Sequence, residues 1–192
     1  MKDSFPREQA AHAGKFLLGI AALFLLFNYI LSLIGYAAFE NFYAEASLLV
    51  LKIFGLDGSV VAGEPALISL QIFSVPVGIS YLCTGLLEMT VVWGAILASF
   101  GIPLRKRIIG AVAGAVVIAV FNIARIAASI LIISFFGLDA GNFSHDLLFR
   151  VFLFLTVAGF YYFWFRWAQQ DDAGTGKVKE IKKRLILGKK SV

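Results

Sequence analysis

Long apolar runs constrain the fold of this chain more than any other feature of its sequence. Four of them could each form a helix that crosses a membrane: residues 16–39, 85–100, 108–136 and 146–167. A bilayer core about 30 Å thick needs roughly 20 predominantly apolar residues in a helix. Hydrophobic residues make up 60% of the 192 residues and charged residues only 15%, more apolar surface than a water-soluble core could bury. The sequence therefore predicts an all-α polytopic membrane protein with about four transmembrane helices.

Two segments between the first two runs are expected outside the bilayer core. Residues 42–56 are apolar but short and contain Glu45 and Lys52, which is typical of either an interfacial or a re-entrant helix. Residues 59–75 alternate apolar and polar positions around a turn at 63–65, which predicts a small β-hairpin. Because lipid cannot satisfy exposed strand backbone, we expect this hairpin on the extracytoplasmic side.

The distribution of basic residues predicts the orientation. The first 15 residues, the turn at 105–107 and the end of the chain are rich in Lys and Arg, which places all three in the cytoplasm. An even number of crossings is then required, and four satisfies it. We therefore expect a multi-pass plasma-membrane protein with cytoplasmic termini, an integral membrane catalytic domain at 1–170 and a basic cytoplasmic tail at 171–192.

The small numbers of cysteine and histidine residues limit which kinds of metal site the chain can form. One cysteine excludes an intramolecular disulfide and a cysteine-rich zinc site, and two histidines make a histidine metal cluster unlikely to form. No nucleic-acid motif is present in the sequence. We expect no metal, no cofactor and no nucleic-acid partner.

Three side chains that could take part in catalysis are predicted to lie at the same depth in the membrane. Cys83 stands at the mouth of the second apolar run, where a helix N-terminus favours a thiolate. Arg125 lies roughly 27 Å along a helix from Arg107, which places it near the outer surface. His145 opens the last run, again on the outer side. A thiol, a guanidinium and an imidazole from three helices should therefore meet at the outer face.

Neighbouring polar residues could support such a site. Asn122, Arg125 and Ser129 recur on one helical stripe that should face the bundle interior. Glu88 lies about one turn inside Cys83 and is either a hydrogen-bonded structural acid or an orienting group. Each member of the cluster also has an ordinary structural interpretation: a packed thiol, a paired membrane charge and an interfacial histidine.

The order of these motifs resembles a known family. Residues 83–85 (Cys-Thr-Gly) at a helix mouth, residues 122–126 (Asn-Ile-Ala-Arg-Ile) in a later helix, and His145 resemble the exosortase/archaeosortase family of membrane transpeptidases. The resemblance extends over about residues 75–150, and the chain looks like a short, minimal core form. It implies that Cys83 is the nucleophile and that Arg125 and His145 complete the site. Supporting positions would be Thr84, Gly85, Asn122 and Glu88.

The chemistry expected from these residues is acyl transfer through a thioester. Cys83 would attack a peptide carbonyl, Arg125 would stabilise the oxyanion, and His145 would act as general acid and base. The resemblance implies substrates that are exported proteins with a C-terminal motif, a hydrophobic helix and a basic cluster, and a membrane lipid is a possible acceptor.

Two other functions remain open. One is a simple hydrolytic intramembrane cysteine protease. The other is a non-enzymatic membrane assembly or transport protein, in which Arg125 and Glu88 form an ion pair and Cys83 merely packs.

Overall fold

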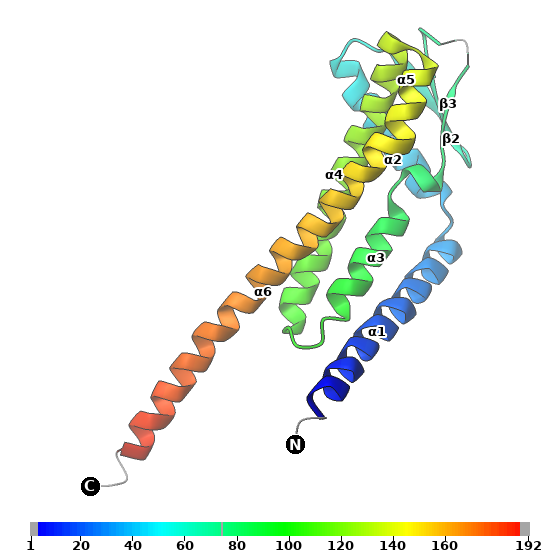
Figure 1. Cartoon of the computed structure of the whole chain (residues 1–192). Helices are drawn as coiled ribbons and strands as arrows, with labels where there is room; N and C mark the ends of the chain where they lie inside the picture. The colour runs from blue at the N-terminus through cyan, green and yellow to red at the C-terminus, as the bar shows by residue number, and fades with distance from the viewer. Residues whose placement is uncertain (1–3, 74, 189–192) are drawn as a thin grey trace.

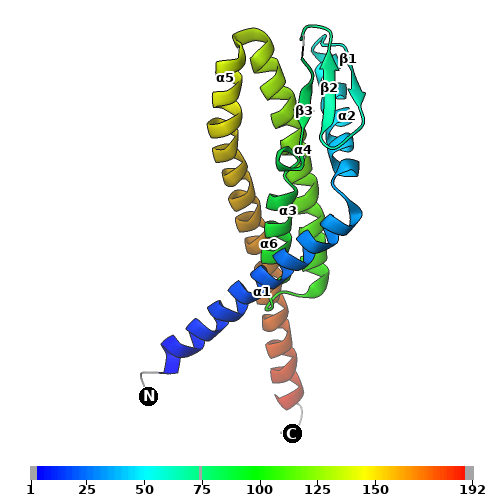
Figure 2. The same ribbon diagram turned by 90° about the vertical axis from the view of Figure 1, so that its right-hand side faces the viewer.

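The structure is a computed structural model that describes residues 4–73 and 75–188, with side chains described for residues 10–170 except those at 74, 146 and 148. It is mostly helical, and a small sheet and a short helix α2 sit at one end of a helix bundle (Figure 1). The start of α1, the α3–α4 loop and the end of α6 all lie at the other end (Figures 1 and 2).

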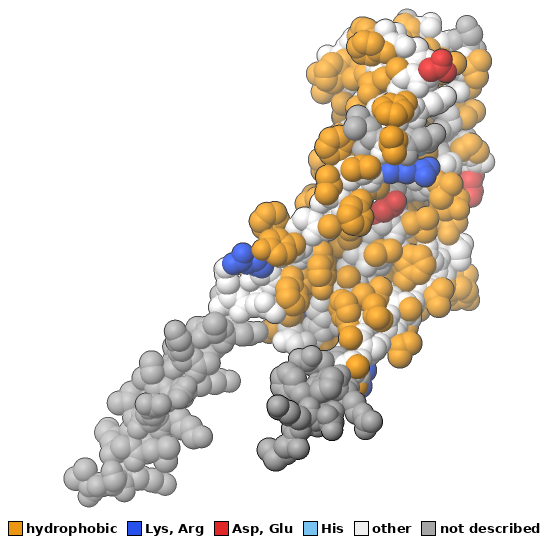
Figure 3. Space-filling model, viewed as in Figure 1, with side chains coloured by type: hydrophobic (Ala, Val, Ile, Leu, Met, Phe, Trp, Pro, Cys, Tyr) orange, Lys and Arg blue, Asp and Glu red, His pale blue; other side chains and the backbone are white. Residues whose placement is uncertain are grey.

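Three long helices form the body of the molecule: α1 (Ser4–Ile34), α4 (Leu104–Phe136) and α6 (Phe149–Gly188). Their segments Ala10–Ile34, Leu104–Phe136 and Phe149–Gln170 are long and apolar enough to cross a membrane. Hydrophobic side chains cover much of the surface seen in Figure 3, with few charged groups among them. Such a surface is stable in lipid rather than in water.

The predicted span at residues 85–100 is shorter than expected. It forms α3 (Leu86–Leu97), whose 12 residues extend only about 18 Å, less than the hydrocarbon core of about 30 Å. The residues before it adopt a 3₁₀ turn and a left-handed glycine, and the α3–α4 loop follows it. The described residues therefore contain three helices long enough to span a membrane, and the predicted count of four is not confirmed. Helix α3 nevertheless returns the chain to the end at which α1 begins (Figure 1).

The predicted hairpin is present and belongs to a three-stranded sheet. Strands β1 (Gly58–Val61), β2 (Ala66–Leu70) and β3 (Val77–Ile79) are antiparallel in the order β1-β2-β3. Ile68 of β2 lies opposite Val60 on one side and Val77 on the other. The third strand was not predicted, because three residues are too few to show a period-two pattern. It leads the chain directly toward Cys83.

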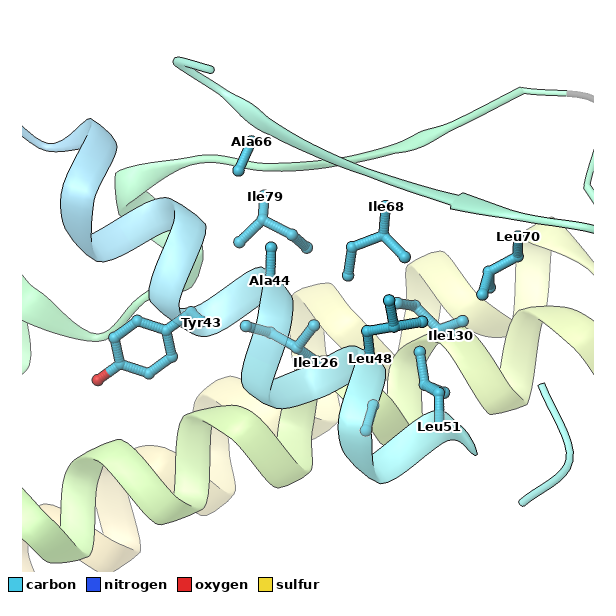
Figure 4. Close-up of a cluster of buried hydrophobic side chains, with 11 residues drawn as sticks. Tyr43, Ala44, Leu48, Leu51, Ala66, Ile68, Leu70, Ile79, Ile126 and Ile130 are labelled. Atoms are coloured by element: carbon cyan, nitrogen blue, oxygen red, sulfur yellow. The ribbon is translucent and has the colours of Figure 1, made fainter. Parts of the chain in front are cut away.

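Helix α2 (Ala37–Ile53) supports one face of this sheet. The predicted interfacial or re-entrant segment 42–56 lies mostly within it. Its buried side chains pack between the sheet and the outer part of α4 (Figure 4), in a cluster that includes Ala44, Leu48, Ile68 and Ile126. Burying each large aliphatic side chain contributes about 1.5–3 kcal/mol, so this cluster fixes the sheet against α4.

A second cluster joins α3, α4 and α6 inside the bundle. Val92, Ile118 and Trp164 are among its buried members. A Cβ atom at Gly110 would meet the Trp164 indole, so the glycine allows α4 and α6 to approach closely. The Trp164 indole N–H donates to the Lys106 carbonyl oxygen at 3.2 Å, which satisfies a polar group that would otherwise be buried in the bundle.

The last helical region begins earlier than predicted. Helix α5 (Leu138–Phe143), the π-helical turn η2 (Ser144–Leu148) and α6 follow one another without a break. His145 therefore lies inside a continuous helical segment instead of opening it. Helix α6 also continues through the predicted domain boundary at residue 170. The side chains of the predicted tail, 171–192, lie outside the described residues.

Candidate active site

Cys83 is held at the end of a short 3₁₀ turn, η1 (Tyr81–Cys83). Its backbone N–H donates to the Ser80 carbonyl oxygen at 2.8 Å, and its Sγ lies 3.7 Å from the Ser80 hydroxyl oxygen. The Tyr81 ring stacks on Tyr36, with 4.9 Å between ring centroids, and ties the turn to the start of α2. These contacts give the thiol a defined position below the sheet.

Thr84 and Gly85 separate the thiol from α3. The Thr84 hydroxyl donates to the Tyr81 carbonyl oxygen at 2.6 Å and accepts the Leu86 N–H at 3.4 Å. Gly85 has φ +73°, a left-handed conformation that favours glycine. The expected placement of the thiol beside the free N–H groups of α3 is therefore not observed; the recorded partners of the sulfur are Ser80 and His145.

Helix α4 presents the predicted polar stripe to the interior. Asn122, Arg125 and Ser129 are 0%, 5% and 6% exposed. The Asn122 amide donates to the Ile118 carbonyl oxygen at 2.9 Å, and its Oδ1 accepts from Arg125 Nη1 at 3.3 Å. The Ser129 hydroxyl donates back to the Arg125 carbonyl oxygen at 2.9 Å. Asn122 thus holds one arm of the guanidinium.

Gly85 allows Asn122 to reach this position. A Cβ atom at Gly85 would lie 2.7 Å from Asn122 Cγ, inside van der Waals contact. The start of α3 and the middle of α4 therefore approach each other where Cys83 and Arg125 are anchored. Thr84, Gly85 and Asn122 support the site through the backbone and through Arg125.

His145 brings the third segment to the cluster. Its Nε2 lies 3.0 Å from Arg125 Nη2. A guanidinium can only donate, so Nε2 accepts in this arrangement and a neutral ring carries its proton on Nδ1. The histidine lies in the π-helical turn η2, an irregularity that is often found at functional sites.

His145 also contacts the sulfur of Cys83. Its hydrogen bond is the main cause that lowers the pKa of the Cys83 thiol, and burial opposes it with a smaller effect. The Ser80 hydroxyl and backbone also lower this pKa. A lowered thiol pKa is one of the features that distinguish a reactive cysteine from an inert, packed one. His145 therefore interacts with both Cys83 and Arg125, which brings η1, η2 and α4 together.

Two other residues differ from expectation. Glu88 is half-buried in the first turn of α3, and no hydrogen bond joins it to the cluster among the described residues. No role for Ser80 was predicted from the sequence. Its position three residues before Cys83 could have indicated one, because a 3₁₀ turn places residues i and i+3 next to each other. Within the described part of the chain, no group of three or more His, Cys, Asp or Glu side chains could hold a metal ion.

Comparisons with known proteins did not identify a similar protein. No family model, curated protein or solved structure matches the chain. The functional assignment therefore rests on the arrangement of Cys83, His145 and Arg125.

Proposed function

We propose that the protein is a membrane-embedded cysteine transpeptidase or protease of the exosortase/archaeosortase type, which cleaves the C-terminal sorting signal of exported proteins. The observation that carries this proposal is that His145 Nε2 lies 3.0 Å from Arg125 Nη2 and that His145 is the main cause that lowers the pKa of Cys83. A thiol that merely packs needs neither an imidazole against its sulfur nor a buried guanidinium behind that imidazole. Nucleophilic catalysis needs both a base and a fixed positive charge.

In the acylation step, the Cys83 sulfur attacks the carbonyl carbon of the scissile peptide bond. The thiol proton passes to His145, the C–N bond of the tetrahedral intermediate breaks, and His145 returns the proton to the departing amine. The products are a thioester on Cys83 and the released C-terminal fragment. The lowered pKa of Cys83 reduces the cost of forming the attacking thiolate.

Arg125 changes partner in this scheme. An imidazolium carries protons on both ring nitrogens and cannot accept the Arg125 hydrogen bond that Nε2 accepts at rest. As negative charge develops on the substrate oxygen, the guanidinium moves its Nη2 donor from His145 to that oxyanion. The same movement frees His145 to hold the proton, so oxyanion stabilisation and proton transfer are coupled.

The thioester then reacts with an acceptor. An amine acceptor, such as one carried by a lipid, attacks the thioester carbonyl and gives its proton to His145. The C–S bond of the tetrahedral intermediate then breaks, and Cys83 leaves as thiolate and regains the proton from His145. Attack by water gives simple hydrolysis, so one site supports either a transpeptidase or a protease. We place this chemistry at the outer face of the plasma membrane, because the basic α3–α4 turn lies at the opposite end of the bundle.

A non-enzymatic role receives less support. In that role Arg125 was expected to form a buried ion pair with Glu88. In the structure Arg125 donates to Asn122 and interacts with His145. The described contacts therefore join the guanidinium to Asn122 and to the imidazole of His145.

The proposal is tested by co-expressing the protein with an exported reporter that ends in a short motif, a hydrophobic helix and a basic cluster. Mass spectrometry of the reporter C-terminus should show cleavage with wild type and none with Cys83→Ala. A mass increase at the new C-terminus indicates transfer, whereas a free carboxylate indicates hydrolysis. Normal processing by Cys83→Ala in cells without a similar enzyme contradicts the proposal.

A variant series separates the roles. Cys83→Ser should be nearly inactive, because a hydroxyl is far harder to ionise than a thiol. Arg125→Lys keeps the charge but loses the planar fork, and we expect a loss of about 100-fold or more, the scale for removal of one oxyanion donor. Ser134→Ala is the matched control, because Ser134 lies on the same helix and only donates to the Ile130 carbonyl oxygen.

A further inference from the structure

A cavity of about 1100 Å³ lies at the end of the bundle opposite Cys83. Its walls come from the N-terminal part of α1, the loop between α3 and α4, and α6. Figure 1 shows the lower parts of α1 and α6 on either side of that loop. The volume is at the upper end of the range for ligand sites, about 300–1,000 Å³.

Close packing of α1 shuts the cavity toward the middle of the bundle. A Cβ atom at Gly19 would lie 3.1 Å from Ala98 Cβ, and one at Gly94 would lie 3.2 Å from the Ile20 carbonyl oxygen. Helices α1 and α3 are therefore in contact at this level, leaving no space between them. The α3–α4 loop that lines the cavity leads directly into the basic residues 105–107.

The lining divides into an apolar wall and a polar rim that includes one lysine. The rings of Phe16, Phe100 and Phe165 contribute to the wall. The rim carries His12 and the exposed Lys15, and none of the described lining residues is acidic. Lys15 lies five residues inside the first apolar segment, Ala10–Ile34, which is the depth at which a lysine reaches the membrane surface.

Three further lining residues carry polar groups. The Ser99 hydroxyl donates to the Ala95 carbonyl oxygen at 2.9 Å and lies 3.3 Å from the Tyr161 hydroxyl, whereas Gln169 is exposed. A ligand that matches this lining combines an anionic group with apolar chains.

We propose that this cavity binds one anionic phospholipid of the adjacent leaflet. Its phosphate pairs with Lys15 and lies beside His12, and an acyl chain lies along the phenylalanine wall. The basic residues 105–107 of the neighbouring turn enrich anionic lipid at this end of the bundle. The lipid fills the space between α1 and α6 and is distinct from any acyl acceptor at Cys83.

Native mass spectrometry of the full-length protein in detergent tests this proposal. Titration with phosphatidylglycerol and phosphatidylcholine should show one retained phosphatidylglycerol with at least fivefold preference. Lys15→Gln should reduce that preference about fivefold, which is the contribution of one basic side chain near an anionic surface. Lys52→Gln is the matched control, an exposed lysine in α2 at the other end of the molecule, and should change nothing. Equal binding of both lipids, or equal effects of the two variants, overturns the proposal.

A second variant probes the apolar part. No atom lies within 4 Å of a Cβ at Gly101, so Gly101→Leu should enter open space in the cavity and reduce binding of both lipids without unfolding the protein. A photoreactive amino acid in place of Phe16 should form lipid adducts in native membranes. Adducts of polypeptide mass would show that a helix of another protein occupies the cavity and would overturn the lipid assignment.

Discussion

Replacing Gly85 with alanine should disturb the site from a buried position beside Asn122. Gly85 has φ +73°, and a non-glycine residue there costs about 1–2 kcal/mol. Its new Cβ would lie 2.7 Å from Asn122 Cγ, and overpacking of this kind costs about 1–3 kcal/mol. Asn122 cannot move aside without breaking its bonds to Ile118 and Arg125. We therefore expect Gly85→Ala to destabilise the protein by about 2–5 kcal/mol.

The assay is unfolding in mixed micelles titrated with sodium dodecyl sulfate, followed by tryptophan fluorescence. Gly101→Ala is the matched control, because its Cβ meets no atom within 4 Å, and it should stay within about 0.5 kcal/mol of wild type. In the double variant Gly85→Ala/Asn122→Ala the steric overlap disappears. Its loss of stability should therefore be smaller than the sum of the losses in the two single variants by about 1–3 kcal/mol. A loss below 0.5 kcal/mol for Gly85→Ala, or strict additivity in the double variant, would refute this reasoning.

Three further predictions concern the thiol, the bundle and the topology. Labelling of Cys83 by iodoacetamide should reach half its maximal rate at a lower pH than for a free cysteine, because its pKa is lowered and the thiolate persists above it. His145→Ala should move that midpoint upward, and an unchanged midpoint contradicts the hydrogen bond. Gly110→Leu should separate α4 from α6, because its side chain meets an indole, and should cost at least about 1–3 kcal/mol in the same unfolding titration. A reporter fused after Gly141 should read outside and one after Arg105 cytoplasmic; reversed signals would place the site on the wrong side for exported substrates.

Several features of the fold follow from local sequence. Helices α1, α4 and α6 are long apolar runs, and a run of that length forms a helix in lipid whatever its neighbours are. The β1–β2 hairpin follows from alternating residues around a turn. The stripe of Asn122, Arg125 and Ser129 follows from helical periodicity, because a buried arginine must face the interior of the bundle.

The length of α3 depended on contacts beyond the local sequence. The helix begins at Leu86, one residue after the predicted start, and ends at Leu97, three residues before the predicted end. The Arg107 guanidinium donates to the Leu97 carbonyl oxygen at 2.7 Å, which satisfies a carbonyl group of the last turn, and the following loop buries Ala98, Ser99 and Ile102. Hydropathy records how apolar a segment is, but it does not record which side chain bonds to the end of the helix.

The sequence by itself determined that a thiol, a guanidinium and an imidazole lie at one depth, because depth follows from counting residues along helices of fixed rise. Only the tertiary structure decided that His145 lies in a π-helical turn and that its Nε2 accepts from Arg125. It also decided that the Cys83 sulfur interacts with His145 and Ser80 instead of with the N-terminus of α3. Arg125 and Cys83 are each separated from His145 by tens of residues, and their pairing with it depends on how α4 packs against α3, α5 and η2. Rotation about each helix axis is set by that packing, and no local pattern in the chain specifies it.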